Sequence, residues 1–386
     1  MALTLENKID LLAEGAGFDV CQPLPGAAAP QGPDWSRWLY PAVISGGRVI
    51  NLFKVLLSNI CFNDCLYCAH RRDADCRRAS FGPDELVRAF LELNRRGRAQ
   101  GLFLSSALAG SGAATMERML AAVERLRLRE GFRGYVHLKV MPGAERAAVA
   151  RAVQLADRVS INLEAPNQQR LAALSQEKDF ADLQQRLRWA AELRREGVGA
   201  PAGITTQFVV GAAGESDAEL LATAARLYRE VGLARAYYSA FQPLPGTPLE
   251  GRPQTPRRRE LRLYQADFLV HRYGFRPDEM VLDEFGNLPQ GLDPKLAWAR
   301  AHPEVFPVDL NRADWALLLR VPGIGPRGAA AVMAARREVS LRSPEQLRAL
   351  GISPRRAAPF VLLAGRRPEP PSSRQESLWP EGELAD

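Results

Sequence analysis

Cysteine and histidine are scarce in this chain of 386 residues, which has five cysteines and four histidines. An odd number of cysteines excludes complete pairing, so the chain lacks the disulfide framework of a small secreted protein. The first fifteen residues lack the basic start and continuous apolar core of a signal peptide, and no apolar run is long enough to span a membrane. These absences lead us to expect a reducing, cytoplasmic location.

Negative charge is scarce in residues 308–367, which precede an acidic last stretch. Residues 308–367 contain eleven arginines, no lysine and four acidic residues, which gives this segment a net charge of +7. The whole chain is also basic, with a sequence pI of about 9.4. A local basic excess is compatible with a polyanionic partner such as nucleic acid.

Strand and helix patterns alternate six times between residues 49 and 272. The strand candidates are nearly continuous in apolar character, as expected of strands buried on both faces; they are residues 49–58, 101–106, 135–141, 158–165, 203–211 and 236–243. Helical patterns follow at residues 83–97, 115–131, 144–157, 179–197, 216–232 and 257–272. Six successive units predict an α/β fold, a partial (β/α)6 barrel whose chemistry lies at the carboxyl ends of its strands.

The composition divides the chain into five regions. We expect an irregular N-terminal extension over residues 1–47, with a loop at 24–33, the barrel over 48–272, and an irregular wrap or linker over 273–307. A small all-α domain follows over 308–367, and a disordered acidic tail over 368–386.

Three cysteines lie within eight residues, immediately after the first predicted strand. Cys61, Cys65 and Cys68 have the spacing C-x3-C-x2-C. Three thiolates can hold three irons of a [4Fe–4S] cluster and leave the fourth iron open to another ligand. The alternative is a structural zinc site with Cys76 or His70 as the fourth ligand. The position at the catalytic end of a barrel favours the cluster.

This motif, with the aromatic Tyr67 before its last cysteine, resembles the signature of the radical S-adenosylmethionine (SAM) superfamily over about residues 45–250. The resemblance implies two cofactors, a [4Fe–4S] cluster and SAM, and an electron donor such as flavodoxin or ferredoxin. It also implies that the cluster reductively cleaves SAM to a 5′-deoxyadenosyl radical, and that Tyr67 lies near the adenine.

The end of the second predicted strand departs from the superfamily pattern. Many members have Gly-Gly-Glu there and use it to hold the amino group of SAM, whereas this chain has Leu104-Ser105-Ser106-Ala107. Backbone carbonyls could hold the amino group, assisted by the Ser105 and Ser106 hydroxyls. The structural alternative is an ordinary strand end.

Two later strands carry further candidates for SAM contacts. Ser160, Asn162 and Glu164 alternate along the fourth predicted strand, so we expect them to face the same side of the sheet. The resemblance implies that Asn162 and Glu164 contact the SAM ribose or carboxylate. It also implies that Gly211, after the fifth strand, lets the adenine approach; a simple turn glycine is the alternative.

Cys76 lies eight residues beyond the last cysteine of the motif. A thiol near a radical site can return a hydrogen atom to a product radical, which makes Cys76 a catalytic candidate. An incidental loop cysteine is the alternative. Together with Cys21 it is too little to indicate a second cluster.

A hairpin sequence lies between two helical patterns in residues 308–338. Gly323-Ile324-Gly325, followed by Pro326 and Arg327, resembles the helix-hairpin-helix motif. In that motif backbone N–H groups at the start of the second helix face a phosphate, Ile324 packs into the core and Arg327 adds a phosphate contact. A weaker copy over residues 341–363 supplies Arg355 and Arg356. The alternative is a hairpin used only for protein packing.

The combination of barrel and hairpins resembles a bacterial family of DNA modification and repair radical SAM proteins. The stretches that carry this likeness are residues 101–106, 115–119, 134–144 and 156–166. We therefore expect a radical SAM enzyme that acts on duplex DNA. The alternatives are an RNA substrate such as tRNA, a small-molecule substrate, and a non-catalytic iron–sulfur protein that binds DNA and senses redox state.

Overall fold

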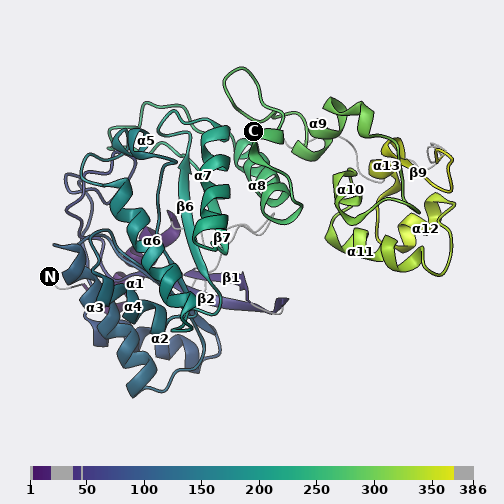
Figure 1. Cartoon of the computed structure of the whole chain (residues 1–386). Coiled ribbons are helices and arrows are strands. Elements are labelled where there is room, and N and C mark those ends of the chain that lie inside the picture. Colours follow the sequence, from purple (N-terminus) through teal and green to yellow (C-terminus); the bar gives the residue numbers. More distant parts are fainter. Residues whose placement is uncertain (1–2, 19–37, 45–46, 369–386) are drawn as a thin grey trace. The chain divides into compact units, whose positions relative to one another are not determined.

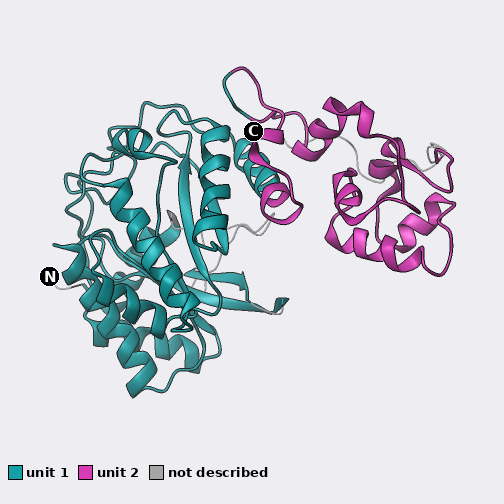
Figure 2. Cartoon of the chain, in the orientation of Figure 1, with its two compact units in different colours: residues 1–267, 285–287 teal, residues 268–284, 288–386 magenta. Residues whose placement is uncertain are grey.

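The computed structural model describes residues 3–18, 38–44 and 47–368. The chain divides into two compact units: unit 1 is residues 1–267 and 285–287, and unit 2 is residues 268–284 and 288–386 (Figure 2). Within the described ranges no helix is long and apolar enough to cross a membrane. The loop predicted at 24–33, Cys21, and the tail predicted beyond residue 368 lie outside the described residues.

Unit 1 is built on one seven-stranded sheet whose strands follow the order of the sequence. All six predicted strands are present and paired in parallel, the fourth over fewer residues than expected. They are β2 Val49–Leu56, β3 Gly101–Ser105, β4 Tyr135–Lys139, β5 Arg158–Ser160, β6 Ile204–Val210 and β7 Arg235–Ala240. Because consecutive parallel strands are joined by helices that cover one face, the sheet curls into a half-barrel (Figure 1).

The predicted helices of unit 1 are present between these strands. They are α2 Pro83–Arg95, α3 Gly112–Glu124, α4 Arg146–Leu155, α6 Phe180–Arg195, α7 Asp217–Glu230 and α8 Arg257–Arg272, with an additional short α5 Gln168–Ala172. A π-helical turn, Arg125–Arg129, extends α3. A capping box stabilises the start of α7, because the Ser216 hydroxyl accepts from Glu219 N and the Glu219 carboxylate accepts from Ser216 N.

The expectation that residues 1–47 are wholly irregular is wrong. Helix α1, Leu5–Gly15, begins at Thr4, whose hydroxyl caps it, and a 3-10 turn, Ala16–Phe18, follows. Its Ile9 and Leu12 are fully buried in unit 1. Strand β1, Leu39–Val43, pairs antiparallel with β2 and adds the seventh strand at the edge of the sheet.

The fourth predicted strand is shorter than expected, since β5 ends at Ser160 rather than near residue 165. Glu164 has a φ of 65°, which is rare for a residue with a side chain and does not fit a strand. The backbone nevertheless stays beside β6: Glu164 N donates to Gln207 O and forms an isolated bridge with Phe208. Strand alternation therefore does not govern the direction of side chains beyond Ser160.

Unit 2 is a small helical module with its own apolar core. Its helices are α9 Pro294–Ala301, α10 Trp315–Arg320, α11 Pro326–Ala335, α12 Pro344–Ala349 and α13 Pro354–Ala357, with 3-10 turns at Pro277–Glu279, Pro303–Val305 and Ala358–Phe360. Two very short strands, β8 Val308–Asp309 and β9 Val361–Leu362, pair in parallel and join the two ends of the hairpin region. The core includes Ile324 from the turn between α10 and α11, Val332 of α11 and Leu347 of α12.

The segment 273–307 is not the irregular wrap that its proline content predicts, because it contains α9. Asp293 caps this helix by accepting from Lys295 N and Leu296 N, and Pro294 occupies its first position. Trp298 of α9 is 5% exposed and its ring packs edge-on against Phe275 at 5.4 Å. The segment is therefore part of the packed body of unit 2.

Candidate functional site

A cavity of about 210 Å³ lies at the carboxyl ends of the parallel strands in unit 1. Its wall is assembled from the ends of several strands and the loops that follow them. Among the lining residues are Cys61, Cys65, Tyr67 and Cys68 after β2, Ser105 and Ser106 at the end of β3, Asn162 and Glu164 after β5, and Phe241 after β7. The fold therefore brings most of the predicted site residues to one place.

The three cysteines of the motif all line this cavity. Among the described residues, no three His, Cys, Asp or Glu side chains converge closely enough to hold a single metal ion. Three thiols on one cavity wall are the ligands that the sequence predicts for a [4Fe–4S] cluster. Burial raises the pKa of the Cys68 thiol to about 12 and also raises that of Cys65. Bound iron would favour the thiolate form that this burial opposes.

The cysteine loop is held by groups that do not line the cavity. Asp64 accepts hydrogen bonds from the Ser175 hydroxyl and from Gln176 N. Burial alone would raise the pKa of Asp64, but these hydrogen bonds outweigh it and lower the pKa. Across the loop, the Arg78 guanidinium donates to four backbone carbonyls, those of Asn59, His70, Arg71 and Ala74. The loop is thus ordered by its own sequence neighbourhood and by the segment that precedes α6.

A buried ion pair, absent from the sequence analysis, lies in the cavity wall. Lys178 Nζ lies 3.2 Å from Glu164 Oε1 and 3.4 Å from the Tyr67 hydroxyl. Both charged side chains are less than a tenth exposed. Burial lowers the pKa of Lys178, but the acidic groups around it, Cys65 and Glu164 first, outweigh burial and raise the pKa well above its usual value. The ammonium therefore stays charged beside the cysteines.

Ser105 and Ser106 both line the cavity but differ in how their hydroxyls are used. The Ser106 hydroxyl donates to Ala107 O at 2.7 Å. The Ser105 residue is 1% exposed, and its hydroxyl has no hydrogen-bond partner within the described part of the chain. A buried hydroxyl without a partner costs free energy unless a ligand satisfies it, so this atom fits a polar ligand in the cavity.

Gly211 has a different setting from the one predicted, because it does not line the cavity. Its φ is 92°, and a Cβ on this residue would lie 1.9 Å from Thr255 Oγ1. Glycine is therefore required here by the packing of Thr255 and by the backbone conformation. Val209, two residues earlier, is the lining residue at this strand end.

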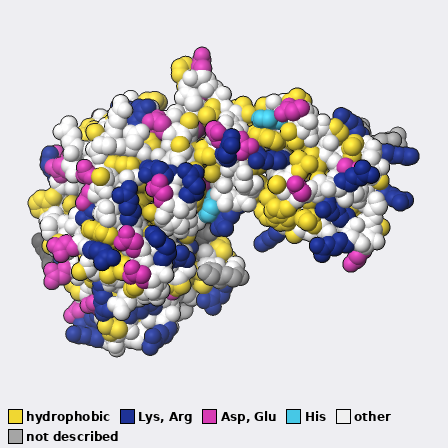
Figure 3. Space-filling view, viewed as in Figure 1, with side chains coloured by type: hydrophobic (Ala, Val, Ile, Leu, Met, Phe, Trp, Pro, Cys, Tyr) yellow, Lys and Arg dark blue, Asp and Glu magenta, His cyan; other side chains and the backbone are white. Residues whose placement is uncertain are grey.

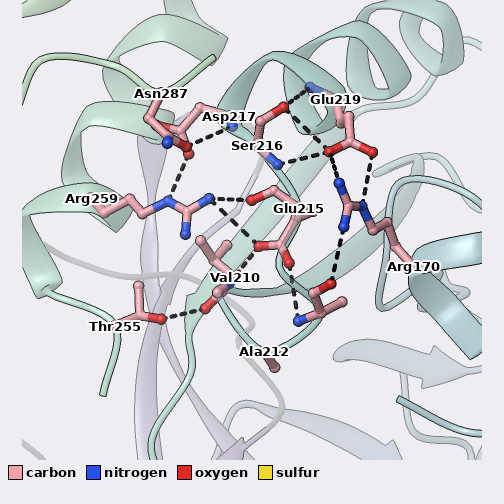
Figure 4. Close-up of polar contacts among 12 residues, drawn as sticks. Arg170, Val210, Ala212, Glu215, Ser216, Asp217, Glu219, Thr255, Arg259 and Asn287 are labelled. Carbon is pink, nitrogen blue, oxygen red and sulfur yellow. Dashed lines mark hydrogen bonds and ion pairs between the residues drawn. The ribbon is translucent and has the colours of Figure 1, made fainter. Parts of the chain in front are cut away.

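The loop between β6 and α7 is fixed by a buried polar network (Figure 4). The Glu215 carboxylate accepts from Gly211 N and Ala213 N, and burial raises its pKa. Arg259 of α8 donates to Asp217 at 2.8 Å and to Glu215 O at 2.8 Å. This network links α8 to the rim of the half-barrel and keeps the β6–α7 loop in one conformation.

Cys76 is not among the residues that line the cavity. Its sulfur lies 4.0 Å from His70 Nδ1, and His70 itself lines the cavity. The predicted catalytic thiol is therefore next to a residue of the cavity wall but is not itself part of that wall.

The predicted hairpin of unit 2 is formed by α10, a tight turn and α11. Gly323 has a φ of 84°, Ile324 is 1% exposed, and Gly325 is the N-cap residue of α11. Among the described residues no side chain caps the first turn of this helix, and Arg327 is exposed beside it. Free N–H groups at the start of a ten-residue helix, next to a basic side chain, can bind a phosphate.

The second hairpin is smaller than the first. Gly351 has a φ of 73° between α12 and α13, but α13 is only four residues long. Arg355 and Arg356 are exposed, and Arg356 is paired with Asp293 at 3.0 Å. On the face seen in Figure 3, basic side chains lie along the edges of unit 2. This copy offers side-chain charge rather than a helix terminus.

Family models match both units. Residues 55–227 match the model of the radical SAM superfamily. The chain carries a radical SAM domain. Residues 306–355 match the helix-hairpin-helix motif. Radical SAM enzymes use a [4Fe–4S] cluster and SAM, which agrees with the cofactors expected from the sequence. The motif in unit 2 is of a kind that suggests nucleic-acid binding.

Solved structures similar to the radical SAM domain share little sequence with it. The [FeFe]-hydrogenase maturase HydG from Carboxydothermus hydrogenoformans is 15% identical with a TM-score of 0.46, over 56% of this chain and 50% of HydG. Methylornithine synthase (PylB) is 15% identical with a TM-score of 0.45, over 56% and 61%. A radical SAM methyltransferase from Sphaerobacter thermophilus is 16% identical with a TM-score of 0.43, over 61% and 74%. The chain thus spans about half of HydG.

The sequence contains a signal that could have found Lys178. The chain has 46 arginines but five lysines. Lys139 and Lys178 line the cavity, and Lys54 and Lys295 are buried elsewhere. In an arginine-rich chain the few lysines can be considered one by one, as candidates for places where a compact ammonium fits better than a planar guanidinium.

Proposed function

We propose that this radical SAM enzyme acts on DNA, in DNA modification or repair. The observation that carries the proposal is the presence in one chain of a three-cysteine cavity and of a hairpin whose α11 N-terminus is uncapped. The arginine excess of residues 308–367 supports a polyanionic partner for that hairpin.

In this proposal Cys61, Cys65 and Cys68 hold the cluster, and Ser105 and the cavity wall around it hold SAM. When bound, these cofactors supply one-electron chemistry that removes a hydrogen atom from the substrate. An electron donor such as flavodoxin or ferredoxin completes the system.

The side chains of the wall have separate proposed roles. Tyr67, Asn162 and Glu164 contact SAM, and Lys178 fixes Glu164 and Tyr67 in place. Apolar lining residues such as Val140 and Met141 exclude water. We give Cys76 no catalytic role, because it is not a lining residue of the cavity. We give Gly211 a role in the β6–α7 loop rather than at the adenine, because Thr255 occupies the space beside its Cα.

The hairpins bind the sugar–phosphate backbone in this proposal. Gly323, Ile324 and Gly325 shape the turn, and Arg327, Arg355 and Arg356 add charge. Contacts of this kind position a duplex without identifying its sequence. A base or sugar would then have to leave the stack to enter the barrel cavity.

The test is anaerobic reconstitution of the full chain with iron and sulfide, followed by dithionite and SAM with or without duplex DNA. We expect DNA to stimulate formation of 5′-deoxyadenosine. Reversing two exposed charges, Arg327→Glu with Arg355→Glu, should remove the stimulation and leave the basal rate. Arg188→Glu, an exposed position on α6, is the matched control for charge reversal.

Three other outcomes would contradict the proposal. Stimulation by tRNA but not by DNA would identify RNA as the substrate. Turnover that is indifferent to the double variant would indicate a small-molecule substrate. A [4Fe–4S] spectrum without 5′-deoxyadenosine, whatever nucleic acid is added, would indicate a non-catalytic sensor.

A further inference from the structure

Lys295 is one of the five lysines of the chain and is buried in unit 2, with 7% of its surface exposed. It comes from α9, in the segment that the sequence predicts to be a linker. Burying an ammonium group is costly unless it has a partner. The groups around Lys295 therefore indicate which role its charge has.

The partner of Lys295 is the hairpin turn. Its Nζ donates a hydrogen bond to Ile324 O at 2.5 Å. Ile324 is the middle residue of the Gly323–Gly325 turn that leads into α11. The ammonium thus lies against the peptide group whose orientation sets the direction of the neighbouring backbone N–H groups.

Two more side chains contact the same turn. A Cβ on Gly325 would lie 2.9 Å from the Tyr273 hydroxyl, and one on Gly323 would lie 2.9 Å from Arg356 Cβ. The Tyr273 ring is also 4.9 Å from Lys295 Nζ. Lys295, Tyr273 and Arg356 therefore all lie against the turn. Among the described residues, Lys295 is the one side chain that donates a hydrogen bond to the backbone of the turn.

The charges that face Lys295 do not neutralise it by contact. Asp293 is near enough to raise the pKa of Lys295, and Arg356 and Arg320 lower it, but burial dominates and lowers it to about 7. Within the described residues, the ion-pair partner of Asp293 is Arg356, and that of Arg320 is Glu279 at 2.7 Å. The ammonium is left with a neutral carbonyl, beside a helix N-terminus that is itself positive.

We propose that Lys295 is a positioning residue of the phosphate-binding hairpin: it orients the turn through Ile324 O and supplies buried positive charge that a bound phosphate neutralises. This inference rests on the proposed function, because it takes the phosphate to belong to DNA. It makes α9 and Tyr273 part of the nucleic-acid interface rather than of a linker.

The test compares Lys295→Met with Arg300→Met in the full-length chain. Both variants remove one positive charge from α9, but Arg300 is exposed. Binding of a fluorescent duplex is followed by anisotropy at several salt concentrations. We expect Lys295→Met to bind about tenfold more weakly, with the salt dependence of its Kd reduced by about one phosphate contact, and Arg300→Met to change by about twofold or less.

Two further measurements separate positioning from folding. In the absence of DNA, hydrogen exchange of the peptide spanning residues 321–328 should accelerate in Lys295→Met but not in Arg300→Met. The wild-type chain should lose affinity about tenfold between pH 6 and 8.5, because the ammonium loses its proton through pH 7. Lys295→Met should lack this pH dependence, which separates it from titration of His271 and His302.

The outcomes that overturn the inference differ from those that overturn the proposed function. If the wild-type chain binds duplex but Lys295→Met matches Arg300→Met in affinity or in salt dependence, Lys295 has no role in phosphate binding. Unchanged hairpin exchange removes the positioning role even if affinity falls. A wild-type chain that binds no DNA at any pH refutes the proposed function, and the phosphate part of this inference with it.

Discussion

The two units each bury a lysine at their candidate site, but they surround it with different partners. In unit 1, Lys178 pairs with the Glu164 carboxylate at 3.2 Å, and its pKa is raised. In unit 2, Lys295 donates to the neutral Ile324 carbonyl, and its pKa is lowered to about 7. The same side chain therefore carries a fixed charge in one unit and a titratable charge in the other.

The difference shows how a partner determines what a buried charge can do. A carboxylate partner offsets part of the desolvation cost of the ammonium within the folded chain, so the ion pair becomes a permanent part of the cavity wall. A carbonyl offsets less of that cost, so the ammonium is still stabilised by an anion that binds from outside. We therefore expect the charge of Lys178 to be compensated before a ligand binds in the barrel, and the charge of Lys295 to be compensated only when a ligand binds to the hairpin.

The largest expected effect concerns the three cysteines of the cavity that Lys178 also lines. Cys65→Ala should abolish the visible absorbance of the reconstituted [4Fe–4S] cluster and all formation of 5′-deoxyadenosine, because two thiolates cannot replace three cluster ligands. Cys76→Ala is the matched control and should retain both signals. A Cys76→Ala variant that loses the cluster would show that the ligand set has been assigned incorrectly.

The next effect tests whether the pair in unit 1 is permanent. Lys178→Met leaves the Glu164 carboxylate buried without its partner, which should lower the free energy of unfolding of unit 1 by about 3–5 kcal/mol. Denaturant titration, with exchange of unit 1 peptides as the probe, would measure it. SAM binding should weaken as well, because Glu164 and Tyr67 lose their positioning contact.

Neutralising the stranded carboxylate provides the control for this experiment. In the double variant Lys178→Met with Glu164→Gln, the free energy of unfolding should recover most of the loss. If the single variant is as stable as the wild type, the pair contributes no net stability and the contrast with Lys295 fails.

Local sequence patterns predicted most of the fold. The β-branched strands and the capped helices of the half-barrel depend on neighbouring residues, and the capping box of Ser216 and Glu219 is an example. The length of β5 and the irregular character of segment 273–307 were predicted wrongly, because contacts with residues distant in the sequence determine both. The left-handed Glu164 is maintained by contacts with β6, and α9 is stabilised by packing of Trp298.

The site follows the same division. The spacing of Cys61, Cys65 and Cys68 is local, so the sequence alone predicted that they share one site, and all three line the cavity. Lys178 reaches Glu164 only because the loop before α6 folds back over the cavity, and no spacing in the sequence encodes that contact. Predicting it requires asking which residue could pair with a buried Glu164.

The smallest expected effect is the pH dependence of stability in unit 2. The folded-state pKa of Lys295 is about 7 because of burial, whereas an unfolded lysine titrates near its ordinary value of 10.5. Between these values the unfolded chain binds more protons, so the free energy of unfolding should rise with pH, by about 2 kcal/mol between pH 7 and 9. DNA affinity should fall over the same range, because DNA binding favours the protonated Lys295, whereas folding favours the neutral form.

Hydrogen exchange of the α9–α11 peptides in the full chain measures the change in the free energy of unfolding, at a series of pH values and with correction for intrinsic exchange rates. Lys295→Met should make unit 2 insensitive to pH in this window, while unit 1, where Lys178 stays paired, should show no such rise in either chain. A rise of equal size in Lys295→Met would assign the titration to another group and remove the contrast between the two lysines.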